Sequence, residues 1–212
     1  MNTTMRSILA AASAILFTCC MGASVNQSLT IPDGEKRTGG FNTVNGSITI
    51  GSDCEIGGDC HTVNGAIKVG DNTSVSGLGT VNGGITLGRG VEVSGGVGTV
   101  NGPVRCGSGS TVSGEVSTVN GEIILTDTRV GKDVRTINGD MRLEDGTRVD
   151  GNLVVDDNKG SNDERGELRI EITGGSVVDG DVIVHEDDLD VVVYLTDGGR
   201  VKGEVIGAKI AD

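Results

Sequence analysis

Residues 80–98 read TVNGGITLGRGVEVSGGVG, and this stretch decides the fold. Apolar and polar residues alternate at Ile85 and Leu87. The same alternation recurs at Val91 and Val93, and a period of two residues is typical of β-strands. Glycines separate these short apolar segments and mark bends. The stretch therefore predicts three short strands that make one turn of a triangular coil.

The Thr-Val-Asn-Gly element repeats along the chain at starts that lie 18 or 19 residues apart. A fixed period of this length is typical of a stacked repeat protein. One repeat alone buries almost nothing, so equivalent residues of successive repeats must stack into shared core columns. One expected core column comprises Val44, Val63, Val81, Val100, Val119 and Ile137. A second comprises Ile50, Val69, Leu87, Cys106, Leu125 and Leu143.

A second signature, apolar-x-Gly-x-apolar, continues after the Asn-Gly element is lost. Its copies begin at Val93, Val112, Val130, Val149, Val178 and Val201. We expect a lead-in with a worn first rung at 24–42, regular repeats at 43–155, and divergent rungs with a cap at 167–212. The wide gap after Val149 predicts an inserted polar loop at 156–166, which is rich in Asp, Asn, Gly and Ser. The fold class is thus an all-β, single-stranded parallel β-helix of about nine rungs, roughly 45 Å long.

The N-terminus has the features of a signal peptide over residues 1–23. Arg6 supplies the positive charge, and the apolar run 8–17 is too short to span a bilayer as a stable helix. This predicts a signal helix ahead of the solenoid. It also predicts an exported protein of the periplasm or outer membrane.

The end of the apolar run offers two ways of processing. Leu16 to Cys19 resembles a bacterial lipobox, in which Cys19 would be lipidated and would hold the solenoid on the membrane. The residue before this cysteine is a threonine, whereas lipoboxes usually have Gly, Ala or Ser there. The alternatives are ordinary cleavage after Gly22 or Ala23 and a helical anchor that is retained.

The charge and composition exclude several classes of function. The formal net charge is −13, whereas phosphate binding needs clustered Lys and Arg, so no nucleic-acid partner is expected. The same charge opposes docking on an anionic membrane surface. Aromatic residues make up only 1% of the chain, and glycine reaches 37. An aliphatic core closed by tight turns accounts for this composition.

The repeated asparagines form one predicted polar column. Its members are Asn45, Asn64, Asn82, Asn101, Asn120 and Asn138. A column of amides could be a track that binds a ligand. The favoured interpretation is a structural asparagine ladder, in which stacked amides hydrogen-bond from rung to rung.

The remaining cysteines and the histidines give little chemistry. Cys54 and Cys60 are close enough in sequence for a disulfide, which an oxidising compartment permits, but both also fit as small core residues. Cys106 falls in a core column. His61 and His185 lack the spacing of a metal site, so no metal or cofactor is expected.

No catalytic constellation is visible, and the chain is expected not to be an enzyme. A solenoid that cleaves polysaccharide would need paired carboxylates and, usually, aromatic platforms for sugars. Beyond the signal peptide the aromatic residues are only Phe41 and Tyr194. No combination of Ser, Cys and His supports nucleophilic catalysis.

The Val-x-Gly-x-Val step and the aliphatic columns resemble the bactofilin family of polymer-forming bacterial β-helix proteins. The Thr-Val-Asn-Gly-x-Ile element is similar to the repeat of bacterial adhesin-type domains, which are also β-solenoids. The resemblance covers about residues 37–206 and implies a right-handed coil, while a six-residue step in the apolar pattern leaves a left-handed coil open.

These features leave two main hypotheses and one weaker one. The first is a monomeric, non-enzymatic binding or adhesin-like module of the cell envelope, with an unidentified envelope or surface partner. The second is a bactofilin-like scaffold that assembles end to end. The weaker one is a solenoid enzyme that acts on polysaccharide. Charged residues such as Lys36 and Arg37 near the first rung favour the monomer.

Overall fold

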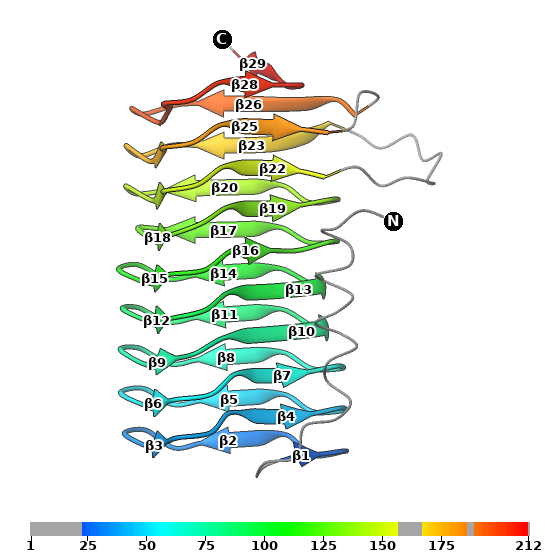
Figure 1. The fold of residues 1–212 in the computed structure, drawn as a ribbon, viewed down its shortest axis with the longest axis vertical. Helices are drawn as coiled ribbons and strands as arrows, with labels where there is room; N and C mark the ends of the chain where they lie inside the picture. The colour runs from blue at the N-terminus through cyan, green and yellow to red at the C-terminus, as the bar shows by residue number, and fades with distance from the viewer. Residues whose placement is uncertain (1–22, 157–166, 186–188, 212) are drawn as a thin grey trace.

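The computed structural model describes residues 23–156, 167–185 and 189–211. These residues form one all-β parallel solenoid of about nine turns, and the rungs stack from the N-terminal to the C-terminal end (Figure 1). Three strands per turn build three parallel sheets, as the repeat predicted. Among the described residues no helix is long and apolar enough to cross a membrane.

Each sheet takes one strand from every rung. The first sheet contains β1 (Ala23–Ser24), β4 (Phe41–Thr43), β7 (Cys60–Thr62), β10 (Leu78–Asn82), β13 (Val97–Asn101), β16 (Val116–Ser117), β19 (Val134–Thr136), β22 (Leu153–Val155), β25 (Val182–Val184) and β28 (Val205–Ile206). The second contains β2 (Leu29–Ile31), β5 (Ile48–Ile50), β8 (Ile67–Val69), β11 (Ile85–Leu87), β14 (Val104–Cys106), β17 (Ile123–Thr126), β20 (Met141–Glu144), β23 (Leu168–Ile172), β26 (Val191–Leu195) and β29 (Lys209–Ala211). The third contains β3 (Lys36–Arg37), β6 (Glu55–Ile56), β9 (Ser74–Val75), β12 (Glu92–Val93), β15 (Thr111–Val112), β18 (Arg129–Val130), β21 (Arg148–Val149), β24 (Val177–Val178) and β27 (Arg200–Val201).

The core is a set of aliphatic columns that run the length of the rod. The predicted column from Ile50 to Leu143 is confirmed, because its six members pair in register and are at most 4% exposed. Parallel pairing stacks Ile, Val, Leu and Cys side chains directly above one another, so the core is filled without aromatic rings. The stacking interactions between rungs therefore provide the stability that one rung lacks.

The other predicted core column, from Val44 to Ile137, is wrong over most of its length. In β10, Leu78 and Thr80 point inward, so Val81 points outward and is only half-buried. Val44 is 37% exposed, and only Ile137 is buried. Strict alternation along the strand decides the direction, and it sets the threonines of the repeat into the core instead.

The buried threonines are tolerated because their hydroxyls have partners. Thr99 is 2% exposed, and its Oγ1 donates a hydrogen bond of 2.8 Å to the carbonyl oxygen of Gly83, one rung earlier. Equivalent hydrogen bonds join Thr62 to Gly46, Thr80 to Gly65, and Thr118 to Gly102. A buried hydroxyl with a good acceptor avoids the cost of desolvation. The threonine thus fastens each Asn-Gly corner to the next rung.

The glycine of each Asn-Gly corner is required by close approach between rungs. A Cβ placed on Gly102 would lie 2.2 Å from the carbonyl oxygen of Gly83. The corner after the second sheet has a different requirement, since Asp53 and Asn72 adopt positive φ there (56° and 54°). Asn, Asp and Gly accept this conformation most readily.

The predicted boundaries meet the structure in different ways. Residues 24–42 contribute to a complete first rung, and residues after 167 continue all three sheets rather than leaving them. The signal peptide up to Gly22, the lipobox at Leu16–Cys19, and residues 157–166 of the predicted loop lie outside the described residues.

Candidate functional site

The asparagines of the repeat form a continuous ladder along the corner after the first sheet. Each Nδ2 donates to the Oδ1 of the asparagine one rung earlier, at 2.7 to 2.9 Å. The ladder begins one rung before the predicted column, because Asn45 donates to Asn26. The Asn-Gly pattern did not identify Asn26, because no glycine follows it. Its position, 19 residues before Asn45, fits the period of the repeat. These hydrogen bonds within the column favour a structural role over a ligand track.

A shallow groove follows the outer face of the third sheet in its N-terminal part. The groove has a volume of about 570 Å³ and crosses β3, β6, β9, β12 and β15. Small hydroxyl side chains line much of it: Ser74, Ser76, Ser94, Thr111 and Ser113. Its charged lining residues are two carboxylates, Glu55 and Glu92, and two cations, Lys36 and Arg37, of which Lys36 pairs with Glu55. Successive strands of the sheet repeat every ~4.8 Å. The groove therefore offers a regular array of hydrogen-bonding groups on a rigid surface.

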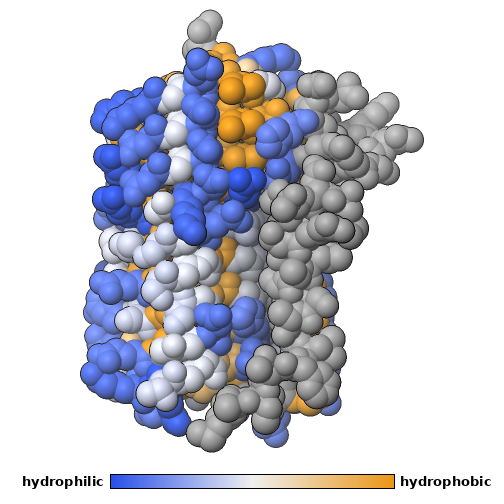
Figure 2. Space-filling model, in the orientation of Figure 1, coloured by the Kyte–Doolittle hydropathy of each residue, from blue (hydrophilic) through white to orange (hydrophobic). Residues whose placement is uncertain are grey.

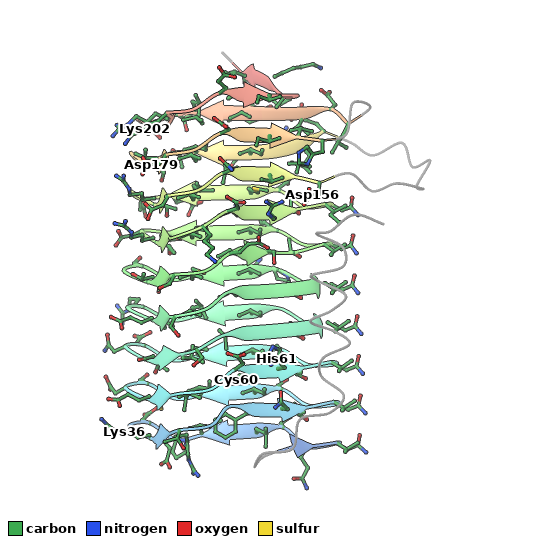
Figure 3. The ribbon with its side chains drawn as sticks, in the orientation of Figure 1. Lys36, Cys60, His61, Asp156, Asp179 and Lys202 are labelled. Atoms are coloured by element: carbon green, nitrogen blue, oxygen red, sulfur yellow. The ribbon has the colours of Figure 1, made fainter. Side chains whose placement is uncertain are left out.

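The same face carries ion pairs in its C-terminal part. Arg129 Nη2 lies 2.7 Å from Asp150 Oδ2, and Arg148 Nε lies 3.2 Å from Asp150 Oδ1. Arg148 also pairs with Asp179, whose Oδ1 lies 2.7 Å from Lys202 Nζ. Figure 3 shows Asp179 and Lys202 at the same edge of the rod. The hydrogen bond from Lys202, together with Arg148, holds the pKa of Asp179 below its usual value.

A second cluster of charges surrounds Arg135 on the outer face of the first sheet. Its guanidinium lies 3.1 Å from Glu115, 2.7 Å from Asp133 and 3.4 Å from Asp156. Asp156 Oδ1 in turn lies 3.1 Å from Nδ1 of His185. Burial raises the pKa of Glu115, and Arg135 opposes that shift. The cluster is half-buried and sets three carboxylates against one guanidinium, so it is an acidic part of this face.

Apolar surface is also unevenly spread over the first sheet. Figure 2 shows that hydrophobic surface on the face in view gathers near the C-terminal end, between hydrophilic residues. In that part of the first sheet the outward column contains Val154, which is covered (1% exposed), and then Ile183 and Ile206. Ile206 is 46% exposed.

The three described cysteines are free, buried thiols. No bond joins Cys54 and Cys60, which lie at the corner before β6 and in β7. Burial raises the pKa of Cys60 to about 11 and that of Cys106 to about 12. Thiols with such pKa values are poor nucleophiles at neutral pH. Their environment fits a packing role.

The two histidines lie far apart on the first sheet. His61 lies against Gly79, where a Cβ would come within 2.6 Å of the imidazole, and Figure 3 shows it beside Cys60 on β7. Burial lowers the pKa of His61, and the nearby Asp59 opposes the shift. Within the described ranges no group of three or more His, Cys, Asp or Glu side chains is arranged to hold a metal ion.

Comparison with known proteins gives no match: no family model, no curated protein and no solved structure matches this chain.

Proposed function

We propose that the chain is an exported, non-enzymatic rod of the cell envelope that binds an uncharged, hydroxyl-rich polymer. The groove on the third sheet carries the proposal. Its hydroxyl groups and carboxylates can exchange hydrogen bonds with sugar hydroxyls over several rungs. The net charge of −13 opposes anionic polymers. The coil is proposed to be right-handed, as the likeness to bactofilins implies.

A binding experiment on envelope material tests this function. The full chain, with a C-terminal tag, would be produced in a bacterial host and purified from the envelope fraction. We expect it to sediment with purified cell-wall glycan. A Ser94→Arg substitution would fill the groove and abolish co-sedimentation, whereas Ser108→Arg, on an exposed turn outside the groove, would not. Equal sedimentation of all three proteins, or of none, would contradict the proposal.

The export part of the proposal has its own measurement. The mass of the mature N-terminal peptide from the envelope fraction would show which residue comes first. A lipidated Cys19 is one expected product, and a chain that starts after Gly22 or Ala23 is the other. An intact Met1 in the cytosolic fraction would contradict export.

Assembly through the last described rung is a second candidate function. Ile206 and Ile210 are 46% and 53% exposed, and Val201 and Val205 of the core columns are only partly buried. A second copy could cover these side chains and act as a scaffold.

One arrangement of that assembly is unfavourable. Continuing the third sheet from head to tail would place Arg200 of one copy on Lys36 of the next, since both lie in one outward column. The monomer therefore remains our first proposal. Light scattering of the purified protein over a concentration series tests it, and growth of the mass with concentration would favour the scaffold.

A further inference from the structure

A second hollow lies at the corner after the first sheet, where the asparagine ladder reaches Asn138. This ladder-end pocket has a volume of about 340 Å³, which is within the usual range for small-ligand sites. It is separate from the groove on the third sheet. Its lining includes three apolar and three acidic residues: Ile137, Leu168, Leu189, Glu122, Asp140 and Glu167.

The pocket arises because the corner changes its construction here. Up to Gly139 the corners stack tightly, and a Cβ on Gly139 would lie 1.9 Å from the carbonyl oxygen of Gly121. In the next rung Ile170 pairs with Met141, so Leu168 stands where the earlier rung has Gly139. The corner glycine is thus replaced by a leucine that packs into the core, and the tight stacking of the earlier corners ends beside the hollow.

The floor of the pocket is apolar. Ile137 and Leu168 are each 7% exposed, and Leu189 packs against the core. Ile137 directly follows β19 and Leu168 begins β23, and both strands are paired in register with their neighbours. The floor is therefore preformed, and an aliphatic group that enters it would lose apolar surface to water at little cost in protein ordering.

All charged residues that line the pocket are carboxylates. Glu122 is neutralised from outside by Arg105 and Arg142, at 3.4 and 3.3 Å. Glu167 is ion-paired with Arg169 at 2.9 Å, and Asp140 has no cationic partner among the described ion pairs. Asp140 accepts the backbone N–H of Arg169 through Oδ1, and Glu167 uses Oε1 for Arg169 and Tyr194. Among the described contacts, the second oxygen of each remains available as an acceptor.

We propose that the ladder-end pocket binds an aliphatic ammonium group. The ammonium is held by Asp140 and Glu167, and its hydrocarbon chain lies over Ile137, Leu168 and Leu189. Lysine-like ammonium groups are charged at neutral pH, and they supply three donors to a site whose charged lining residues are all carboxylates. The same chemistry is carried by a free diamine and by a lysine side chain of a partner protein.

Methyl NMR titration of the purified protein tests this proposal with defined probes. Cadaverine represents the free diamine, and Nα-acetyl-lysine methylamide represents the lysine side chain. We expect saturable shifts of the methyl signals of Ile137, Leu168 and Leu189 with both probes. Tighter binding of cadaverine would identify a free diamine as the ligand, and tighter binding of the lysine derivative would identify a protein partner.

Matched controls make the outcome decisive. Pentanol has the same hydrocarbon chain without charge, and we expect it to bind at least tenfold more weakly. A Glu167→Gln/Asp140→Asn variant should weaken cadaverine binding at least tenfold, whereas Asp179→Asn on the third sheet should leave it unchanged. Undisturbed methyl signals of the remaining core show that each variant is folded. Absence of saturable shifts, equal binding of pentanol, or full binding by the double variant would overturn the proposal.

Discussion

The N-terminal half of the rod (residues 23–138) and the C-terminal half (residues 139–211 as described) share one core, but different chemistry joins their rungs at the surface. The N-terminal half uses neutral amides, from Asn26 to Asn138, along the corner after the first sheet. Towards the C-terminus the rungs are joined at another corner, the one that precedes each strand of the first sheet. There a side-chain oxygen of one rung accepts a backbone N–H of the next rung. These links run from Asp133 to Asn152, from Asn152 to Asp181, and from Asp181 to Glu204.

The two solutions differ in what they leave for function. An asparagine both donates and accepts, so a column of them satisfies itself and needs no charge. The acceptor-only carboxylates further along the rod draw in arginines such as Arg129 and Arg148. The packing of the core does not change with the surface chemistry, since Val130 and Val149 are both fully buried. The surface can therefore diversify while the fold is conserved along the rod.

The largest expected effect comes from breaking the tight corner of the N-terminal half. Gly102→Ala would force a methyl group to within 2.2 Å of the Gly83 carbonyl oxygen. Neither the backbone that carries the methyl group nor the backbone of Gly83 can move without disturbing neighbouring rungs. We expect a loss of about 3 kcal/mol in the free energy of unfolding, measured by urea denaturation.

Gly39→Ala is the matched control for that substitution. Gly39 is exposed and has no atom within 4 Å of the added Cβ. We expect a change within about 0.5 kcal/mol, in either direction. A similar loss in both variants would mean that close approach between rungs is not what requires glycine at the Asn-Gly corner.

Two threonines of the repeat differ in whether their buried hydroxyl has a partner. Thr99→Val removes the hydroxyl that donates to Gly83, and it should cost about 1 kcal/mol because a part-buried carbonyl oxygen loses this hydrogen bond. Thr136 is also buried, but within the described structure its Oγ1 has no hydrogen-bond partner. Thr136→Val should therefore be neutral or stabilising. Thermal unfolding of both variants checks this, and equal destabilisation would remove the distinction between the two rungs.

The amide ladder itself should make a smaller contribution. Asn101→Ala deletes the link between Asn82 and Asn120, whose amides are exposed and can turn to water. We expect a loss of about 1 kcal/mol. Hydrogen exchange should show faster opening on both sides of the gap, since each rung depends on its neighbours. Exchange that changes only at residue 101 would argue against a cooperative ladder.

The sequence predicted the repeat, the three strands per turn and the column from Ile50 to Leu143, because each rests on a regular period of apolar residues. It placed Val81 and its equivalents wrongly because hydropathy was given more weight than alternation. Leu78 lies two residues before Thr80, and that spacing could have shown that the threonine points inward.

The surface sites could be predicted less well. Alignment of the Val-x-Gly-x-Val copies already places Asp150 beside Arg129 in neighbouring columns, so part of the ion-pair network was accessible from the sequence. The ladder-end pocket was not, since it depends on how far β23 extends beyond β20 at one corner. The period of the sequence predicts the positions that are equivalent in every rung. This pocket forms where one rung departs from that period.

The smallest expected effect concerns the ion pairs of the C-terminal half. Arg148→Ala removes contacts to Asp150 and Asp179, but Asp179 keeps Lys202, and Arg148 is 45% exposed. We expect a loss of about 0.5 kcal/mol at low salt that vanishes in 1 M NaCl, where the screening length is about 3 Å. Because the pKa of Asp179 is lowered by its cationic partners, this contribution is present above the unfolded value of about 3.9 and is lost as the pH falls through the folded value.

Arg89→Ala, which breaks one pair with Asp71 in the N-terminal half, is the matched control and should cost still less. Urea denaturation at two salt concentrations measures both variants, and a salt-independent loss would mean that Arg148 acts through packing rather than through charge.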